Sequence, residues 1–257
     1  MLKTNKVTLK SKLKKQQTTI GSWITLAHPA IAEIMANAGF DWLAVDLEHS
    51  AIGIREAVNL IRVIDLCGAA PLVRLSSNDS VQIKRVMDAG AHGVIVPMVN
   101  SAGDAEKAVD AVYYPPIGRR GVGLARAQGY GPGFAQYLNW LTHEAVVIVQ
   151  IEHIEAANNL EGILAVEGVD GFIVGPYDLS ASLGVAGQFD HPLMKKAMEQ
   201  IEKIGGGSDK ALGIHVVEPQ PDELKTKIEQ GYRFLAYSVD IRMLDYVCRS
   251  GLASVPL

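Results

Sequence analysis

The chain has few cysteines, little net charge and no long apolar run. Its 257 residues include only Cys67 and Cys248, which excludes a disulfide framework or thiolate metal site and fits a reducing, cytoplasmic setting. The formal charge of −4 gives no reason to expect a nucleic-acid or anionic-membrane partner. No apolar run approaches the roughly 18 residues that a membrane span needs. With 48% hydrophobic residues, the chain can bury one barrel-sized core, as an enzyme of this length would.

The first twenty residues are basic. Their lysines stand at positions 3, 6, 10, 12, 14 and 15, and no apolar stretch follows that resembles the core of a signal peptide. We therefore expect residues 1–20 to be a solvated, partly mobile lead-in, and residues 21–257 to form a single domain.

Strand and helix patterns then alternate along the whole chain. Short β-branched runs predict strands at 22–26, 42–47, 71–75, 93–98, 146–152, 171–174, 213–217 and 234–239. Amphipathic patterns predict helices at 29–38, 54–66, 80–89, 103–112, 156–165, 192–204, 221–230 and 243–249. Eight such units predict a (β/α)₈ TIM barrel. A doubly wound sheet is the alternative, but no G-x-G-x-x-G turn follows the first strand.

Two carboxylates follow buried strands. Glu152 ends the run 146–152, and Asp178 comes shortly after the run 171–174. In a barrel the carboxyl ends of the strands form one rim, where the chemistry takes place. Mg²⁺ and Mn²⁺ prefer oxygen ligands and often take only one or two protein carboxylates, which leaves coordination positions for substrate. We therefore predict that Glu152 and Asp178 bind Mg²⁺ or Mn²⁺, with Co²⁺ as a further candidate.

Other strand ends carry groups suited to acid–base chemistry. The second strand ends in Asp46, with His49 just beyond it, and the third strand contains Arg74. Imidazole titrates near neutral pH, so His49 is a candidate base, oriented by a hydrogen bond from one ring nitrogen to Asp46. Arg74 offers a charged fork to a carboxylate or a developing enolate oxygen. A metal opposite Arg74 would clamp a 2-oxo acid from two sides.

Seven motifs together resemble one known family. They are AVDLEH at 44–49, VRL at 73–75, MDAGAHGV at 87–94, PMV at 97–99, YPPIGRRG at 114–121, VQIE at 149–152 and GPYDLS at 175–180. In this order and spacing they resemble the HpcH/HpaI aldolases, the metal-dependent class II pyruvate aldolases of the phosphoenolpyruvate/pyruvate barrel superfamily. The resemblance extends over about residues 21–244.

The resemblance implies a role for each matched position. The metal ligands fall on Glu152 and Asp178, the base on His49 with Asp46 as its partner, and the enolate-stabilising group on Arg74. The implied substrate-binding positions are the aromatic pocket wall Trp23, the pocket residue Gln150, and the segment Gly175, Pro176 and Tyr177, whose backbone amides would hold the pyruvate carboxylate. Asp88 matches a position that supports a neighbouring site.

Two positions depart from the family pattern. Tyr177 stands where a small residue, often alanine, is usual, and His215 stands where leucine is common. Both are expected to face the pocket. A phenol and an imidazole would add bulk and hydrogen-bonding groups there, so these positions bear on the choice of aldehyde more than on the metal chemistry.

The implied reaction is reversible cleavage of a 4-hydroxy-2-oxo acid to pyruvate and an aldehyde through a metal-stabilised enolate. Related superfamily chemistry is the alternative, namely oxaloacetate decarboxylation or carbon–carbon cleavage of a CoA ester. A non-catalytic barrel that binds a 2-oxo acid is the third hypothesis. The presence of every matched polar residue argues against it.

Two expectations concern structure beyond the barrel core. The family commonly forms hexamers from trimers that exchange C-terminal helices, so we expect a homo-oligomer in which residues 242–252 take part. The long irregular segment around residues 114–133 is expected to cap the barrel mouth, because unstructured segments of that length are usually functional or disordered.

Overall fold

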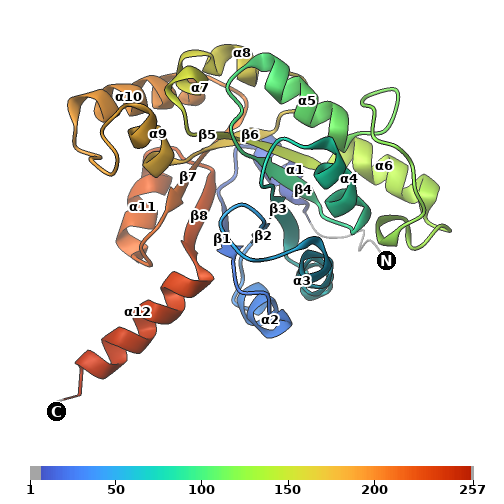
Figure 1. Cartoon of the computed structure of the whole chain (residues 1–257), viewed down its shortest axis with the longest axis horizontal. Helices are drawn as coiled ribbons and strands as arrows, with labels where there is room; N and C mark the ends of the chain where they lie inside the picture. The colour runs from blue at the N-terminus through green and yellow to red at the C-terminus, as the bar shows by residue number, and fades with distance from the viewer. Residues whose placement is uncertain (1–6, 256–257) are drawn as a thin grey trace.

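A closed barrel of eight parallel strands forms the centre of the molecule in the computed structural model, which describes residues 7–255 (Figure 1). The strands are β1 (Thr19–Ile24), β2 (Trp42–Asp46), β3 (Ala70–Arg74), β4 (Gly93–Val96), β5 (Val146–Ile151), β6 (Gly171–Val174), β7 (Ala211–Val216) and β8 (Phe234–Val239). Each strand pairs with the next, and β8 pairs with β1. The predicted (β/α)₈ TIM barrel is confirmed.

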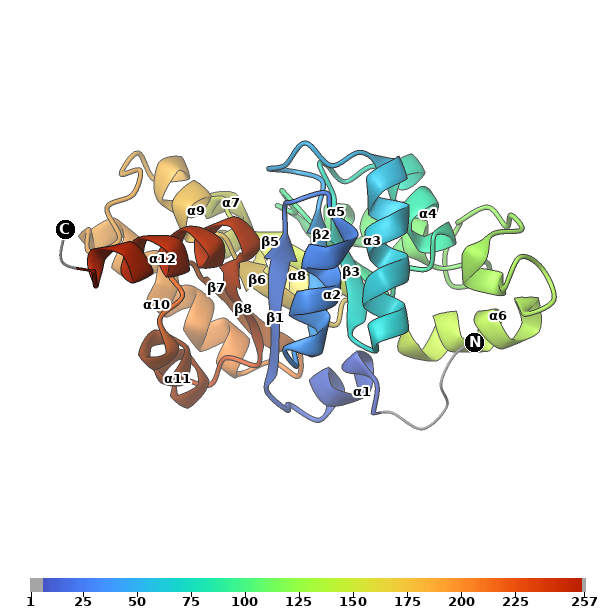
Figure 2. The same cartoon turned by 90° about the horizontal axis from the view of Figure 1, so that it is seen from below.

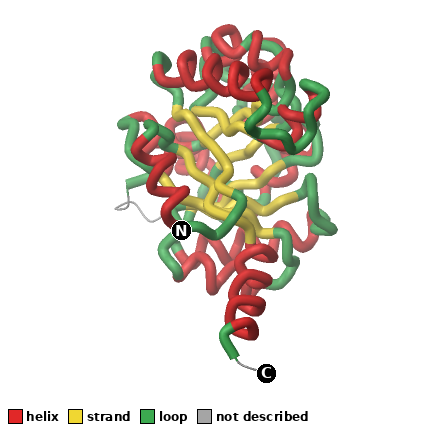
Figure 3. The backbone as a smooth tube through the Cα atoms, turned by 90° about the vertical axis from the view of Figure 1, so that its left-hand side faces the viewer, coloured by secondary structure: helices red, strands yellow, loops and turns green. Residues whose placement is uncertain are grey.

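Helices surround this barrel (Figure 3). They are α1 (Leu9–Lys14), α2 (Pro29–Asn37), α3 (Ile54–Cys67), α4 (Ser80–Asp88), α5 (Ala102–Val112), η1 (Arg126–Gln128), α6 (Phe134–Glu144), α7 (Ile154–Asn158), α8 (Leu160–Leu164), α9 (Pro176–Ser182), α10 (Pro192–Gly206), α11 (Pro221–Glu229) and α12 (Asp240–Ala253). In the part of the chain that the structure describes, no helix is long and apolar enough to cross a membrane.

Strand periodicity decides which residues face the barrel interior. Successive side chains alternate between the faces of a strand, and the inner faces share one apolar cluster that includes Trp42 and Phe234, whose rings stack 4.2 Å apart. Gly21 leaves room for this pair, because a Cβ there would lie 1.9 Å from the Trp42 ring. Every second residue of a strand faces the same side. Asp46 and Arg74 therefore share the interior face with the inner residues of β2 and β3, and they lie at the carboxyl ends of their strands.

The N-terminal helix α1 closes the end of the barrel opposite the mouth (Figure 2). Leu9 and Leu13 are buried, and the Lys10 Nζ lies 3.0 Å from Asp170 and donates to the Ala145 carbonyl at 2.7 Å. Residues 9–14 are therefore packed against the barrel, in contrast to the solvated lead-in that we expected. Residues 1–6 of that lead-in lie outside the described part.

The segment between α5 and α6 does not cap the mouth, so this prediction was wrong. Its Arg126 binds Asp65 near the end of α3 at 2.5 Å and the Ala89 carbonyl that follows α4 at 3.1 Å. Helices of a parallel barrel run opposite to the strands, so the ends of α3 and α4 lie at the face away from the mouth. A segment that follows a helix starts on that face.

Candidate active site

Asp46 and Arg74 form a buried ion pair at the barrel mouth, the end of the barrel where the carboxyl ends of the strands lie. They face each other across neighbouring strands in the β2–β3 register. The Arg74 Nε donates to Asp46 Oδ1 at 2.9 Å, and Nη2 donates to Oδ2 at 2.6 Å. Burial raises the pKa of Asp46, but the hydrogen bonds and charge of Arg74 outweigh that effect and hold the pKa below its usual value. This bidentate geometry fixes the guanidinium plane.

His49 lies at the outer edge of this mouth. The Asp46 carboxylate accepts from the backbone amides of Glu48 and His49 at 2.9 and 3.2 Å, and its other hydrogen bonds are with Arg74. The expected hydrogen bond from the His49 ring to Asp46 is thus not formed. The imidazole is 62% exposed, with its Nε2 3.7 Å from Glu48 Oε2. The His49 ring thus lies beside Glu48 and in contact with solvent.

Glu152 is a buried carboxylate at the mouth, immediately beyond β5. The Met98 backbone amide donates to its Oε1 at 2.6 Å, and the Gln150 side-chain amide donates to its Oε2. Met98 holds a left-handed backbone conformation with φ of 51°, which is uncommon for a residue with a side chain. Burial raises the pKa of Glu152, and the negative charge of Asp178 adds to the effect.

Asp178 lies in the first turn of α9, immediately beyond β6. Gly175 precedes the helix and Pro176 is its first residue. A Cβ on Gly175 would lie 3.3 Å from Glu152 Oε2, so the glycine keeps the space beside that carboxylate open. The Tyr177 ring packs edge-on against Phe189 at 4.9 Å and is 55% exposed. The first-turn amides of α9 have no side-chain cap, which leaves them available to an anion.

Trp23 and His215 line the mouth on the side of β1 and β7. Their rings lie edge to face, 5.7 Å apart, and the Arg74 guanidinium stacks over Trp23 at 4.3 Å. The structure therefore brings Trp23, Asp46, Arg74, Gln150 and His215 to one end of the barrel, together with the segment that carries Asp178.

Comparison with known proteins agrees with this architecture. A model of the family described as HpcH/HpaI aldolase/citrate lyase matches residues 19–245. The chain belongs to the HpcH/HpaI family. It is 40% identical over 237 residues to a hydroxypyruvate/pyruvate aldolase of Pseudomonas aeruginosa, with 91% of this chain and 87% of that protein covered. It is 42% identical to a 4-hydroxy-2-oxo-heptane-1,7-dioate aldolase of Escherichia coli, with 91% and 89% covered.

Solved structures of the HpcH/HpaI family have the same fold. A family member from Burkholderia cenocepacia superposes with a TM-score of 0.89 at 33% identity, and the match covers 95% of this chain and 97% of the other. An aldolase from Desulfitobacterium hafniense superposes with a TM-score of 0.87 at 32% identity, with 97% and 98% covered. With aldolases as its relatives, this HpcH/HpaI member is an enzyme of the carbon–carbon lyase class.

Glu48 is a site residue that the sequence reasoning did not select. Its carboxylate is 15% exposed and lies 3.5 Å from Arg74 Nη1. Burial raises its pKa to about 7, and the charges of Glu152, Asp46 and Asp178 contribute. The motif AVDLEH contains Glu48, but the alternation of strand residues does not show where a residue beyond the strand will point.

The carboxylates fit a divalent cation that takes few protein ligands. Among the described residues, Glu152 and Asp178 make no ion pair with a lysine, arginine or histidine, and no cluster of three or more His, Cys, Asp or Glu side chains forms a complete metal cage. Two carboxylates beside an open space are what Mg²⁺ or Mn²⁺ requires when substrate and water complete its coordination.

Asp88 lies apart from the mouth. It ends α4, and burial raises its pKa while the nearby charge of Arg120 opposes the shift. Arg120 is buried, donates to the Tyr137 hydroxyl at 2.7 Å and stacks on Tyr114 at 4.3 Å. Asp88 is thus associated with the segment between α5 and α6, and the chain's own mouth residues do not contact it.

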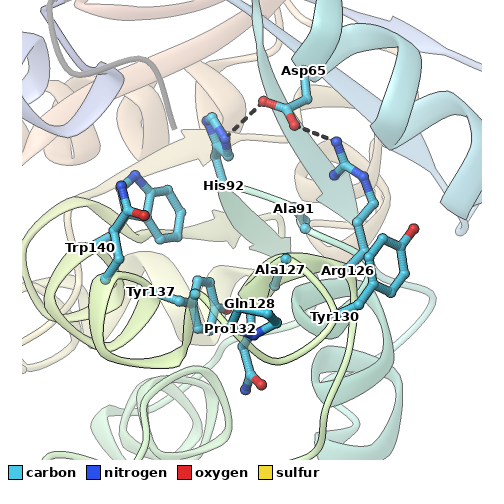
Figure 4. A pocket seen from close by; sticks show the side chains of 14 residues that line it. Asp65, Ala91, His92, Arg126, Ala127, Gln128, Tyr130, Pro132, Tyr137 and Trp140 are labelled. Carbon is cyan, nitrogen blue, oxygen red and sulfur yellow. Dashed lines mark hydrogen bonds and ion pairs between the residues drawn. The ribbon is translucent and has the colours of Figure 1, made fainter. Parts of the chain in front are cut away.

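A separate cavity of about 480 Å³ lies on the outer wall beside η1 and α6 (Figure 4). Asp65 contacts two side chains of its lining, the Arg126 guanidinium at 2.5 Å and the His92 imidazole at 3.5 Å. Burial raises the pKa of Asp65, but its bonds to His92 and Arg126 lower it to about 2. The Trp140 ring packs 5.0 Å from His92. None of the predicted site residues lines this cavity.

Proposed function

We propose that the mouth is the active site of a class II pyruvate aldolase, which reversibly cleaves 4-hydroxy-2-oxo acids to pyruvate and an aldehyde. The observation that carries the proposal is the buried Glu152 carboxylate, which makes no ion pair with a described residue although the charges of both Asp178 and Arg74 act on it. The names of the aldolase relatives support the same reaction.

Glu152 and Asp178 would hold a divalent ion, Mg²⁺ or Mn²⁺, with Co²⁺ as a third candidate. When bound, such an ion lowers the free energy of negative charge on the 2-oxo oxygen of the substrate. Met98 and Gln150 hold the Glu152 carboxylate in place through two hydrogen bonds. Their role is to position a ligand whose orientation sets the geometry of the site.

Arg74 would stabilise the substrate oxygen that gains negative charge. Its Nε and Nη2 are occupied by Asp46, whereas Nη1 lies 3.5 Å from Glu48 Oε2 and could also donate to a bound substrate. The stack on Trp23 holds the guanidinium plane. A donor fixed before the reaction stabilises developing charge without reorganising. The open amides of Tyr177 and Asp178 would bind the pyruvate carboxylate.

His49 would take the proton from the 4-hydroxyl group in the cleavage direction. Its exposed ring lies next to Glu48, and its backbone is fixed by Asp46. Proton transfer requires the ring to come within hydrogen-bond distance of the hydroxyl. Glu48, whose Oε2 lies 3.7 Å from His49 Nε2 and whose pKa is raised by burial, can accept a proton from His49 after that step.

We also propose that the enzyme is a cytoplasmic homo-oligomer, a trimer or hexamer. Helix α12 projects away from the barrel (Figure 1). Its apolar side chains Leu244, Val247 and Leu252 are 55, 65 and 75% exposed, an arrangement that a neighbouring subunit would cover. Cys67 and Cys248 are both free thiols, which is consistent with a reducing compartment.

The test of the proposed function is pyruvate release from a panel of 4-hydroxy-2-oxo acids, with Mg²⁺ or with chelator. We expect release with at least one member of the panel only in the presence of metal. Glu152→Ala is expected to abolish that release, whereas Glu155→Ala changes a neighbouring exposed carboxylate and serves as the matched control. Full activity of the Glu152 variant would overturn the proposal.

A further inference from the structure

His215 occupies an unusual place in the barrel. It lies on β7 two residues beyond Gly213 and faces the interior, where the Trp23 ring packs against it. Interior positions in parallel barrels are usually filled by branched apolar side chains. An imidazole in this position has two polar nitrogens, and each needs a hydrogen-bond partner from the protein or from the substrate. A buried polar group without a partner raises the free energy of the folded state.

One of the two nitrogens is occupied by the backbone. Nε2 lies 3.2 Å from the Ser238 carbonyl oxygen, and a carbonyl oxygen only accepts. Nε2 therefore carries the hydrogen. The same oxygen accepts from the Ser22 hydroxyl at 3.1 Å, and Ser238 holds a left-handed backbone with φ of 51°. The carbonyl is thus held in place from two sides, and it fixes the imidazole tautomer.

The other nitrogen is left as an acceptor. Burial lowers the pKa of His215 to about 4, and the positive charge of Arg74 contributes, so the ring is neutral at physiological pH. With the hydrogen on Nε2, Nδ1 keeps its lone pair. Nδ1 accepts no hydrogen bond from any described residue, and the His215 side chain is partly exposed.

From this geometry we infer that His215 selects an aldehyde that carries a hydroxyl group, by accepting a hydrogen bond from that hydroxyl through Nδ1. The inference rests on the proposed pyruvate aldolase function and adds the chemical class of its second substrate. A hydroxyl donor would satisfy the lone pair, whereas an aldehyde with a purely apolar substituent would leave it unpaired. A site that hydrogen-bonds a substrate hydroxyl discriminates against the analogue that lacks it.

The test compares glycolaldehyde with acetaldehyde as partners for pyruvate. The quantity to measure is the ratio of the two kcat/KM values in the wild-type enzyme, in His215→Leu and in His215→Asn. Leucine removes the acceptor, whereas the asparagine amide oxygen can replace Nδ1. Taking the ratio within each variant cancels any loss of folded enzyme, and comparing the ratios between variants cancels the intrinsic reactivity of the aldehydes.

We expect the glycolaldehyde preference to fall about tenfold in His215→Leu and to stay within about threefold of wild type in His215→Asn, since a tenfold change is the size of one hydrogen bond. An unchanged preference in the leucine variant, or equal losses in both variants, would overturn the inference. Wild-type enzyme that joins pyruvate to neither aldehyde and does not exchange pyruvate C3 protons would instead overturn the proposed function. Imidazole ¹⁵N spectra report the Nε2–H tautomer independently of turnover.

Discussion

Arg74 is held at the mouth by contacts on two sides. Two of its nitrogens bind Asp46 and its plane stacks on Trp23. A lysine keeps the charge but cannot form the fork or the stack. We expect Arg74→Lys to lower kcat for pyruvate release about 100-fold, the usual effect of losing a fixed donor to developing charge. Steady-state kinetics of Arg126→Lys, on the outer wall, are the control. Equal kcat in wild type and the Arg74 variant would contradict the assigned role.

Glu48 makes the stability of the metal-free enzyme depend on pH. Its pKa is raised from 4.5 to about 7 on folding. Between these values the folded state binds a proton that the unfolded state has released, so the free energy of unfolding falls as pH rises. By pH 8 the free energy of unfolding has fallen by up to about 3 kcal/mol, at 1.36 kcal/mol per pKa unit.

We expect Glu48→Gln to remove most of that loss. Urea denaturation at pH 5 and pH 8 in the presence of chelator measures it. Glu33→Gln, on an exposed face of α2, is the control and should behave as wild type. The same pH dependence in wild type and Glu48→Gln would show that Glu48 does not titrate as described.

The sequence predicted single residues well where they lie within strands. Alternate residues of β2 and β3 face the barrel interior, and Asp46 and Arg74 are among them, as their positions in the apolar runs indicated. Contacts beyond the strand ends were less predictable. Asp46 binds Arg74 instead of the His49 ring, and Tyr177 packs on Phe189. Such contacts depend on loop paths and on side chains far apart in the sequence, which local periodicity does not encode.

Among the elements, α1 depends on one buried lysine. Lys10 is 5% exposed and binds Asp170, Tyr113 and the Ala145 carbonyl. Removing one partner of a buried ion pair leaves the other charge uncompensated. We expect Lys10→Met to lower the free energy of unfolding by about 3 kcal/mol, measured by urea denaturation. Lys14→Met changes an exposed lysine of the same helix and should have little effect. Equal stability of both variants would contradict the anchoring role.

Helix α12 is expected to affect oligomeric state, because its exposed apolar side chains would contact another subunit. Leu244→Glu combined with Val247→Glu would place two charges in that contact. We expect light-scattering mass to fall toward that of one chain while the thermal midpoint of the barrel stays within a few degrees. Ile34→Glu, at another exposed apolar position, is the control. A wild-type mass of one chain would contradict the proposed oligomer.

Helix and strand periodicity predicted most elements, but not all of them. The main helices were placed within a few residues, whereas α1, α6 and α9 were not anticipated. Helices α1 and α9 are short, and α6 directly follows a glycine-rich segment, so local preference indicated none of the three. The position of residues 114–133 was mistaken because their length suggested a cap, although a segment that follows a helix begins at the face opposite the mouth.

In the whole molecule, the carboxyl ends of the eight strands surround one mouth, and side chains from distant parts of the chain meet there. The central claim is that this mouth activates pyruvate with a divalent metal held by Glu152 and Asp178. The most direct measurement is exchange of pyruvate C3 protons for deuterium, followed by NMR, with Mg²⁺ or Mn²⁺ and with chelator. We expect exchange by the wild-type enzyme only when metal is present, with no exchange by Glu152→Gln. Exchange at the same rate after complete metal removal would contradict the central claim.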